Sequence, residues 1–194
     1  RYFKAQCGIV ITASHNPPKY NGYKVYGDDG GQLTPPEEDK IIKEINKINY
    51  NDILFKCNPV KISYIDYEID NEYFKTVLSL GKFSNKNHKN YKIVFTPLHG
   101  ASIKSIPHVL KLAGYNDVNI VEEQSKPDGN FPTVNSPNPE DKEALLMAIN
   151  KAKKIKADIV IGTDPDSDRL GIAVLSYENK WEILNGNQMM MIMI

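Results

Sequence analysis

Residues 157–176 read ADIVIGTDPDSDRLGIAVLS, and this stretch decides the predicted fold of the chain. Its two apolar runs, at 157–163 and 170–176, are rich in β-branched residues and have the length of buried strands. Asp164, Asp166 and Asp168 alternate in the short loop between them. Because open α/β sheets bind ligands at the carboxyl ends of their strands, the stretch predicts a buried sheet with a ligand site at its edge.

The sequence upstream of this stretch alternates strand-like and helix-like segments. The predicted elements are strands at 91–96 and 118–124, a helix at about 101–113 and a helix from Asn138 and Pro139 to about 153. Gly114 is expected to end the first helix, and Pro107 to kink it or delay its start. Strands that alternate with helices predict βαβ units and a largely parallel sheet. The loops TASHNP (12–17) and TPLHG (96–100) are expected at strand ends of the same kind.

The first part of the chain carries weaker patterns. The predicted elements are strands at 8–13 (buried) and 23–27, a helix that begins after Thr34, and a helix at 64–80. Thr34 is expected to cap its helix, because Glu37 follows three residues later, and isoleucines recur after it at helical spacing. Residues 50–62 have no clear period. The polar segment 81–90 is predicted to be a linker beside a domain boundary.

The composition excludes some classes of protein. The chain has 194 residues, 24 basic and 24 acidic side chains and 41% hydrophobic residues. A neutral balance gives no support to nucleic-acid binding. Cys7 and Cys57 are too few for a disulfide framework, so reduced thiols and a cytoplasmic location are expected. The chain opens on Arg1 and closes on MMMIMI (189–194), a run too short to cross a membrane and expected to be the buried face of an interrupted element. We therefore expect a fragment.

The three alternating aspartates favour a hard divalent cation, namely Mg²⁺, Ca²⁺ or Mn²⁺, over zinc. An EF-hand would need glycine where Arg169 stands and glutamate where Leu175 stands, which excludes that loop. An aspartyl-phosphate phosphatase also places D-x-D after a strand, but Asp168 occupies the position where it usually has threonine or valine. A solvated acidic turn remains the structural alternative.

Ser14 offers a hydroxyl in a turn-rich loop, and the acidic loop offers a metal site. Together they suggest phosphoryl transfer, which needs an oxygen that can carry phosphate and a cation that offsets its charge. His15 could orient Ser14 or a phosphate, and Lys24 and Arg169 are cations that a phosphate would require. Each of these four residues is also compatible with an ordinary structural role. No G-x-S-x-G turn surrounds Ser14, so an acyl hydrolase is not indicated.

Four segments closely resemble the α-D-phosphohexomutases, especially the branch of the phosphoglucomutases and phosphopentomutases. These segments are GIVITASHNPPKYNGYKVYG (8–27), TPLHG (96–100), PDGNFPTVNSPNPE (127–140) and GTDPDSDR (162–169). The resemblance covers nearly the whole chain and implies four α/β domains around one cleft. It implies a fold class of α/β type, with mixed or parallel sheets flanked by helices, of which this chain holds parts of two to three domains.

The resemblance also implies roles for single residues. Ser14 matches the serine that carries the phosphoryl group, and Asp164, Asp166 and Asp168 match the ligands of one Mg²⁺ ion, with phosphoserine 14 adding an oxygen. Lys24 matches a proton-transfer residue. The list of implied phosphate-binding residues is His15, Lys24 and Arg169.

The implied reaction interconverts glucose 1-phosphate and glucose 6-phosphate through glucose 1,6-bisphosphate, which is also the implied activator. The implied partner is therefore a hexose phosphate, with neither a nucleic acid nor a membrane involved. The alternatives within the family are phosphomannomutase, phosphopentomutase and hexose-bisphosphate synthase. The alternatives outside it are a metal-dependent phosphatase and a non-catalytic sugar-phosphate-binding protein.

The implied domain map divides the chain into four parts. It assigns residues 1–62 to the end of domain 1, 63–90 to a connecting helix and linker, 91–182 to domain 2 and 183–194 to the start of domain 3. The loops that choose the sugar and bind its phosphate have no counterpart in this sequence. We therefore expect the isolated chain to be inactive as a mutase.

Overall fold

The structure is a computed structural model that describes residues 1–56, 58–81 and 90–194. The predictions for Cys57 and for most of the linker therefore lie outside the described residues. The chain forms two compact units. The first consists of Arg1–Thr12 and Asn21–Ile69, and the second of Ala13–Tyr20 and Asp70–Ile194.

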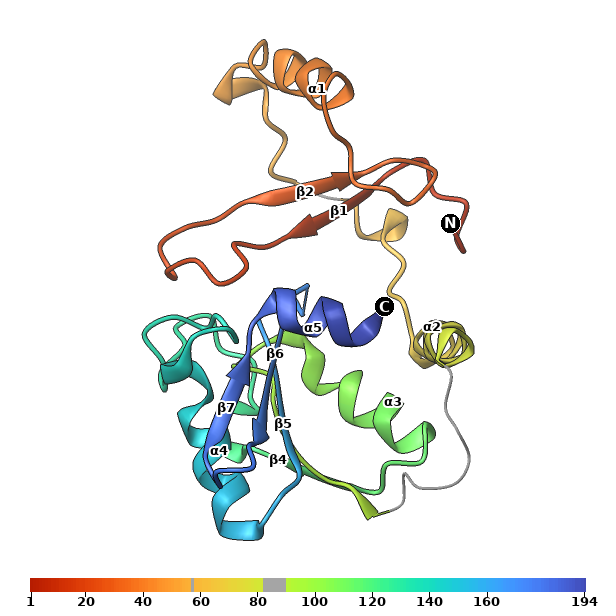
Figure 1. The fold of residues 1–194 in the computed structure, drawn as a ribbon. Helices are drawn as coiled ribbons and strands as arrows, with labels where there is room; N and C mark the ends of the chain where they lie inside the picture. Colours follow the sequence, from red (N-terminus) through yellow and green to blue (C-terminus); the bar gives the residue numbers. More distant parts are fainter. Residues whose placement is uncertain (57, 82–89) are drawn as a thin grey trace. The chain divides into compact units, whose positions relative to one another are not determined.

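The first unit contains an antiparallel hairpin of β1 (Gly8–Ile11) and β2 (Tyr23–Tyr26), drawn in red in Figure 1. Both strands were predicted. The prediction that the first strand is buried is wrong for the described chain, since Ile9 and Ile11 are 60% and 70% exposed. The reason is that β2 is the only strand paired with β1 among the described residues, and a two-stranded sheet covers little of its own surface.

The helix α1 (Glu37–Ile45) follows the hairpin. The predicted cap is wrong: Pro36 is the N-cap residue and makes no side-chain hydrogen bond. The backbone carbonyl of Thr34, not its side chain, accepts hydrogen bonds from the N–H groups of Glu37 and Glu38. The described residues of the segment 50–62, which has no clear sequence period, include the short 3₁₀ turns Tyr50–Asp52 and Pro59–Lys61.

The second unit is built on a five-stranded sheet with the order β4-β3-β5-β6-β7. Its strands are β3 (Lys92–Thr96), β4 (Asp117–Ile120), β5 (Ile159–Thr163), β6 (Leu170–Leu175) and β7 (Trp181–Leu184). The β3–β4 and β3–β5 pairs are parallel, whereas the β5–β6 and β6–β7 pairs are antiparallel. The expected α/β class with a mixed sheet is confirmed, but the sheet is less parallel than the strand–helix alternation suggested. The physical reason is that short turns join the last three strands, and a parallel pair needs a longer crossover.

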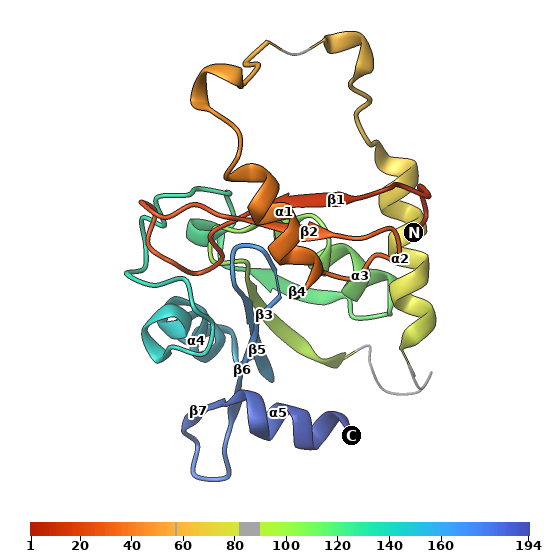
Figure 2. The ribbon, with the colours of Figure 1, turned by 90° about the horizontal axis from the view of Figure 1, so that it is seen from above.

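Two helices supply the crossovers, α3 (Ile106–Leu112) after β3 and α4 (Lys142–Ile155) after β4. Figures 1 and 2 show them on opposite faces of the sheet. The late start of α3 is confirmed, because a 3₁₀ turn, Ala101–Ile103, precedes it and Pro107 lies in its first turn. The predicted start of α4 at Asn138 is four residues too early, since the helix begins at Lys142, directly after the N-cap residue Asp141.

The core of this unit lies between α4 and the sheet. The helix buries residues at the spacing of one helical face, and these are Ala144, Leu145, Ala148, Ile149 and Ala152. All of them except Ala144 belong to one core cluster with Val94 of β3, Val160 of β5 and Val121, which follows β4. Because three of the five helix residues are alanines, the helix axis can approach the sheet closely.

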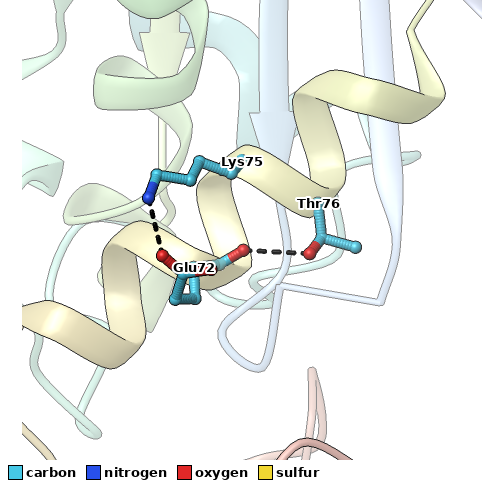
Figure 3. A network of polar contacts seen from close by, with 3 residues as sticks. All are labelled: Glu72, Lys75 and Thr76. Carbon is cyan, nitrogen blue, oxygen red and sulfur yellow. Dashed lines mark hydrogen bonds and ion pairs between the residues drawn. The ribbon is translucent and has the colours of Figure 1, made fainter.

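The helix α2 (Tyr67–Leu80) was predicted and begins three residues later than expected. Its buried residue Phe74 packs against His108 of α3, with ring centroids 5.0 Å apart. Figure 3 shows its polar side: Nζ of Lys75 lies 2.6 Å from Oε1 of Glu72, and Thr76 Oγ1 donates to the Glu72 carbonyl at 2.9 Å. Such an exposed ion pair contributes little stability, so α2 is held mainly through its apolar contact.

The last two elements, β7 and α5 (Gly186–Met193), were not predicted as a strand and a helix. Asn185 begins α5 with a capping box, accepting from the N–H of Gln188 while the Gln188 side chain accepts from the N–H of Asn185. Residues 190–194 are exposed in this chain, so their burial as the face of an interrupted element stays a prediction. Within residues 1–56, 58–81 and 90–194, no helix has the length and apolar composition required to cross a bilayer.

The backbone of the loop before α4 packs closely against Gly171 of β6. A Cβ at this position would lie 2.0 Å from the carbonyl oxygen of Pro139 and 2.6 Å from its carbon. Because these atoms are backbone, Gly171→Ala should lower the free energy of unfolding by about 1–3 kcal/mol. Urea unfolding of the chain measures the change. The control is Gly129→Ala, whose Cβ would meet no atom within 4 Å, and equal stability of the two variants would contradict the prediction.

Candidate metal centre and serine loop

The acidic loop lies where a central strand ends. β5 pairs with β3 on one side and β6 on the other, so residues at its carboxyl end enter the loop already buried. Thr163 is 2% exposed and Asp164 is 0% exposed. Because β3 and β5 are parallel neighbours, the loops that follow Thr96 and Thr163 lie at the same edge of the sheet. This expectation from the sequence is confirmed.

The carboxylates of Asp164, Asp166 and Asp168 each offer an oxygen, and these oxygens lie within 4.8 Å of one another. Their burial decreases along the loop from buried through half-buried to exposed. Three carboxylates this close repel one another unless a cation lies among them. Carboxylate oxygens suit hard divalent ions such as Mg²⁺. The donor set therefore fits a divalent cation that enters from the exposed side.

Backbone hydrogen bonds fold the loop into a turn around Asp164. The Ser167 N–H donates to the Asp164 carbonyl at 2.8 Å, and the Arg169 N–H donates to Asp164 Oδ1 at 2.9 Å. Ser167 adopts a left-handed φ of 63°, a conformation that costs free energy in residues other than glycine. The turn gives Asp164 a fixed orientation and leaves its other oxygen, Oδ2, for a further contact.

The electrostatic state of Asp164 follows from its burial. The pKa of this carboxyl is raised from 3.8 to about 6, and burial is the largest cause. Asp166 also raises the pKa, through a hydrogen bond and through charge repulsion, while hydrogen bonds from the Arg169 N–H and from Ser14 lower it. The charged form of Asp164 is therefore less favourable in the metal-free fold than that of a solvated carboxyl, and a divalent cation would stabilise it.

Ser14 lies beside this carboxylate although 150 positions separate the two residues in the sequence. Its hydroxyl donates to Asp164 Oδ2 at 2.8 Å. Ser14 is half-buried and has a left-handed φ of 52°. Strain of this kind in a residue other than glycine is concentrated at functional sites. The segment Ala13–Tyr20 that carries Ser14 belongs to the second unit with the acidic loop.

The serine loop is the connection of an antiparallel hairpin, which differs from the expected position at the end of a parallel strand. Ile11 pairs with Tyr23, and the Thr12 N–H donates to the Gly22 carbonyl at 3.0 Å. The Asn16 side chain and N–H both donate to the Ala13 carbonyl, at 2.9 and 3.0 Å. This turn bends the chain around Ser14.

The other predicted residues divide between the two units. Nδ1 of His15 lies 3.1 Å from the Ser14 hydroxyl oxygen, so the structure brings His15 to the site. Arg169 is exposed, and its backbone N–H holds Asp164. Lys24 is a half-buried residue of β2 in the first unit, and its place in the site stays a prediction.

The sequence predicted no role for any single residue of the loop TPLHG (96–100). In the structure, Thr96 Oγ1 donates to Gln124 Oε1 at 2.6 Å, and Gln124 Nε2 donates to Thr133 Oγ1 at 3.0 Å. Nε2 of His99 lies 2.9 Å from the same hydroxyl of Thr133. The signal available in the sequence was that two polar residues, Thr96 and His99, stand where a buried strand ends. The partners of Thr96 and His99 lie 28 and 34 positions away in the sequence, which no local pattern reveals.

These observations define an α/β protein with a candidate divalent-cation site that includes a serine hydroxyl. Comparison with known families extends this description. Residues 1–52 match the profile of phosphoglucomutase/phosphomannomutase alpha/beta/alpha domain I, and residues 71–176 match the profile of alpha/beta/alpha domain II of the same family. The chain belongs to the phosphoglucomutase/phosphomannomutase family.

Individual relatives agree with this assignment. The chain is 40% identical over 194 residues to a phosphoglucomutase of Staphylococcus epidermidis, with 97% of this chain and 35% of the relative covered. A phosphoglucomutase/phosphomannomutase family protein of Burkholderia thailandensis has a similar crystal structure, with a TM-score of 0.70, 26% identity, and 96% of this chain and 36% of that chain covered. A putative phosphomannomutase of Thermus thermophilus shares the fold, with a TM-score of 0.69, 23% identity, and 90% and 38% of the two chains covered. The chain thus spans about a third of the length of the relatives that it matches.

The raised pKa of Asp164 predicts how stability depends on pH. Between pH 3.8 and about 6, the folded chain holds a proton on Asp164 that the unfolded chain releases. The contribution of this group to folding is therefore favourable at low pH and is lost as the pH rises through about 6. Asp164→Asn removes the titration, so the metal-free variant should gain stability relative to the unsubstituted chain at neutral pH, and the gain should shrink as the pH falls.

Urea unfolding in the presence of a chelator, repeated at several pH values, measures this difference. Asp141→Asn is the matched control, because Asp141 is exposed and its side chain makes no cap hydrogen bond. A difference between Asp164→Asn and the unsubstituted chain that stays constant with pH would refute the raised pKa.

Proposed function

We propose that this chain supplies the phosphoserine and metal-binding parts of a phosphoglucomutase, which interconverts glucose 1-phosphate and glucose 6-phosphate. The observation that carries the proposal is the 2.8 Å hydrogen bond from the Ser14 hydroxyl to Asp164 Oδ2, which joins the serine loop to the acidic loop. The 40% identity to a phosphoglucomutase supports the choice of reaction and of a hexose phosphate as substrate. A cytoplasmic location and the domain boundaries predicted from the sequence remain parts of this proposal.

Asp164, Asp166 and Asp168 would hold one Mg²⁺ ion together with an oxygen of the phosphate on Ser14. When bound, Mg²⁺ offsets negative charge on a phosphoryl group and on the oxygen that it leaves. The buried Asp164 supplies the most fixed ligand, because it is 0% exposed and the Arg169 N–H holds its Oδ1 within the turn. The exposed Asp168 lies on the side from which an ion and a substrate would enter.

Ser14 would carry the phosphoryl group that is transferred. In the first transfer, the bond between phosphorus and Ser14 Oγ breaks while a bond forms to a hydroxyl oxygen of glucose 1-phosphate. That hydroxyl loses its proton to a general base, and the product is glucose 1,6-bisphosphate. In the second transfer, after the bisphosphate has turned around, the other phosphoryl group returns to Ser14 and glucose 6-phosphate remains.

Three basic residues would assist these steps. Lys24 is the proposed proton-transfer residue for the sugar hydroxyl. Arg169 would bind phosphate oxygens through its exposed guanidinium group. His15 lies within hydrogen-bonding distance of Ser14 Oγ, and it would orient that oxygen before transfer and stabilise its charge after the phosphoryl group leaves.

The role of Ser14 is tested in a protein of the relatives' full length. Residues 1–194 would replace the matching part of the Staphylococcus epidermidis phosphoglucomutase, about 35% of its length. The chimera should convert glucose 1-phosphate to glucose 6-phosphate and carry a phosphoryl mass on the Ser14 peptide. Ser14→Ala should lower turnover by roughly a thousandfold or more, because no oxygen remains to carry the phosphoryl group.

The control for this experiment is Ser79→Ala, which alters an exposed serine of α2 whose hydroxyl donates to the Thr76 carbonyl within the same helix. A folded chimera that turns over normally without the Ser14 hydroxyl would refute the nucleophile. Release of inorganic phosphate in place of glucose 6-phosphate would instead indicate a phosphatase. A folded chimera whose Ser14 cannot be charged by glucose 1,6-bisphosphate would favour a non-catalytic sugar-phosphate-binding protein.

The metal site is tested on the chain itself. Asp166→Asn removes one charged ligand, so Mg²⁺ affinity measured by isothermal titration calorimetry should fall by about 10- to 100-fold, or about 1.4 to 2.8 kcal/mol. Asp141→Asn, an exposed substitution in the same unit, should leave the affinity unchanged. Identical Mg²⁺ titrations of the two variants would exclude Asp166 as a ligand.

A further inference from the structure

The backbone between β3 and α3 is unusual directly beside the acidic loop. Leu98 and His99 adopt left-handed φ values of 45° and 61°, which residues with a Cβ adopt only at a cost in free energy. Both side chains are buried, with exposures of 0% and 4%. Two strained residues in succession persist only where the surroundings hold them in place.

Hydrogen bonds to distant parts of the second unit hold this turn. The Leu98 N–H donates to Thr96 Oγ1 at 3.2 Å, and the His99 N–H donates to the Gln124 carbonyl at 3.0 Å. The His99 carbonyl accepts from the Asp128 N–H at 3.1 Å. The imidazole is held at both nitrogens, by the Lys126 carbonyl at 3.2 Å and the Thr133 hydroxyl at 2.9 Å. The turn is therefore fixed before it reaches Gly100.

Gly100 then lies against the backbone of Pro165, the residue between the first two aspartates. A Cβ on Gly100 would lie 2.5 Å from Pro165 Cα and 2.6 Å from its carbonyl oxygen. The next residue, Ala101, donates its N–H to the same carbonyl at 2.9 Å. Real Cβ atoms do not approach backbone so closely, so any side chain at position 100 would displace either its own strained turn or Pro165.

A second contact holds the other side of Asp164. The hydroxyls of Ser102 and Thr163 lie 2.6 Å apart, and both residues are almost fully buried, at 1% and 2% exposure. Residues 100–102 thus contact the backbone or side chain of the residues immediately before and after Asp164. Because Pro165 is covalently joined to both Asp164 and Asp166, movement of its backbone would move both carboxylates.

We propose that Gly100 is a positioning residue of the acidic loop: its missing Cβ lets Pro165 approach, and the fixed approach aligns Asp164 and Asp166 for a divalent cation. The inference rests on the metal site of the proposed function. Ser102 assists by fixing Thr163. Groups that orient metal ligands from outside the coordination sphere typically change metal affinity by about 10- to 100-fold when they are altered.

The test compares Gly100→Ala with Gly129→Ala in the same chain. Among the residues that the structure describes, no atom lies within 4 Å of a Cβ added at Gly129, and its φ is not left-handed. Isothermal titration with Mg²⁺ alone should show an affinity about tenfold weaker or more for Gly100→Ala and an unchanged affinity for Gly129→Ala. Urea unfolding without metal gives the fraction of each variant that is folded. The Mg²⁺ affinity is then calculated for the folded protein alone. A merely structural glycine would lower stability and leave the affinity of the folded chain unchanged.

Ser102→Ala keeps the inference testable if Gly100→Ala does not fold, because it removes one oxygen and adds no atom. Its Mg²⁺ affinity should fall by about three- to tenfold, whereas Ser105→Ala, one turn further on, should match the unsubstituted chain. Affinities within about twofold of the unsubstituted chain for every folded variant at positions 100 and 102 would overturn the inference and leave the proposed function intact. Absence of Mg²⁺ binding by the unsubstituted chain would overturn both.

Discussion

Burial of the Asp164 carboxylate at the end of β5 is the constraint around which the second unit is organised. A charged group without solvent contact requires partners, and an unpaired one would be protonated. The Ser14 hydroxyl and the Arg169 N–H each hold one of its oxygens, while Asp166 adds negative charge beside it. The proposed Mg²⁺ ion would offset that charge. One buried carboxylate thereby connects the serine loop, the turn of the acidic loop and the metal.

The sheet topology explains why the neighbouring loop can fix this carboxylate so closely. β3 and β5 are adjacent and parallel, with Thr96 opposite Gly162, so the loops that leave them emerge side by side. An antiparallel neighbour would have placed the end of one strand beside the start of the other. The short turn into β6 then returns the chain directly to the sheet, which keeps all three aspartates within one loop of six residues, 164–169.

The family assignment gives these contacts a chemical meaning. The matched profiles are domains I and II of phosphoglucomutase/phosphomannomutase, and the chain spans about a third of the relatives' length. The described residues account for the oxygen that would carry the phosphoryl group and for the ligands that would hold its counter-ion. In the proposed reaction these two parts determine the transfer step, since phosphoryl transfer depends on positioning and charge more than on covalent chemistry by the protein.

The sequence by itself determined the candidate residues, because their signals are local. Three alternating aspartates after a buried strand predict a hard cation, and the motif around Ser14 is long enough to identify the family. The strands β1 to β6 were predicted for the same reason, since an apolar run needs no partner to be recognised, whereas β7 was missed. The mixed direction of the sheet and the exposure of β1 depended on which segments pair, which no short window contains. Only the tertiary structure brought Ser14 to Asp164 across 150 positions and Gly100 to Pro165, because packing, not spacing along the chain, decides such contacts.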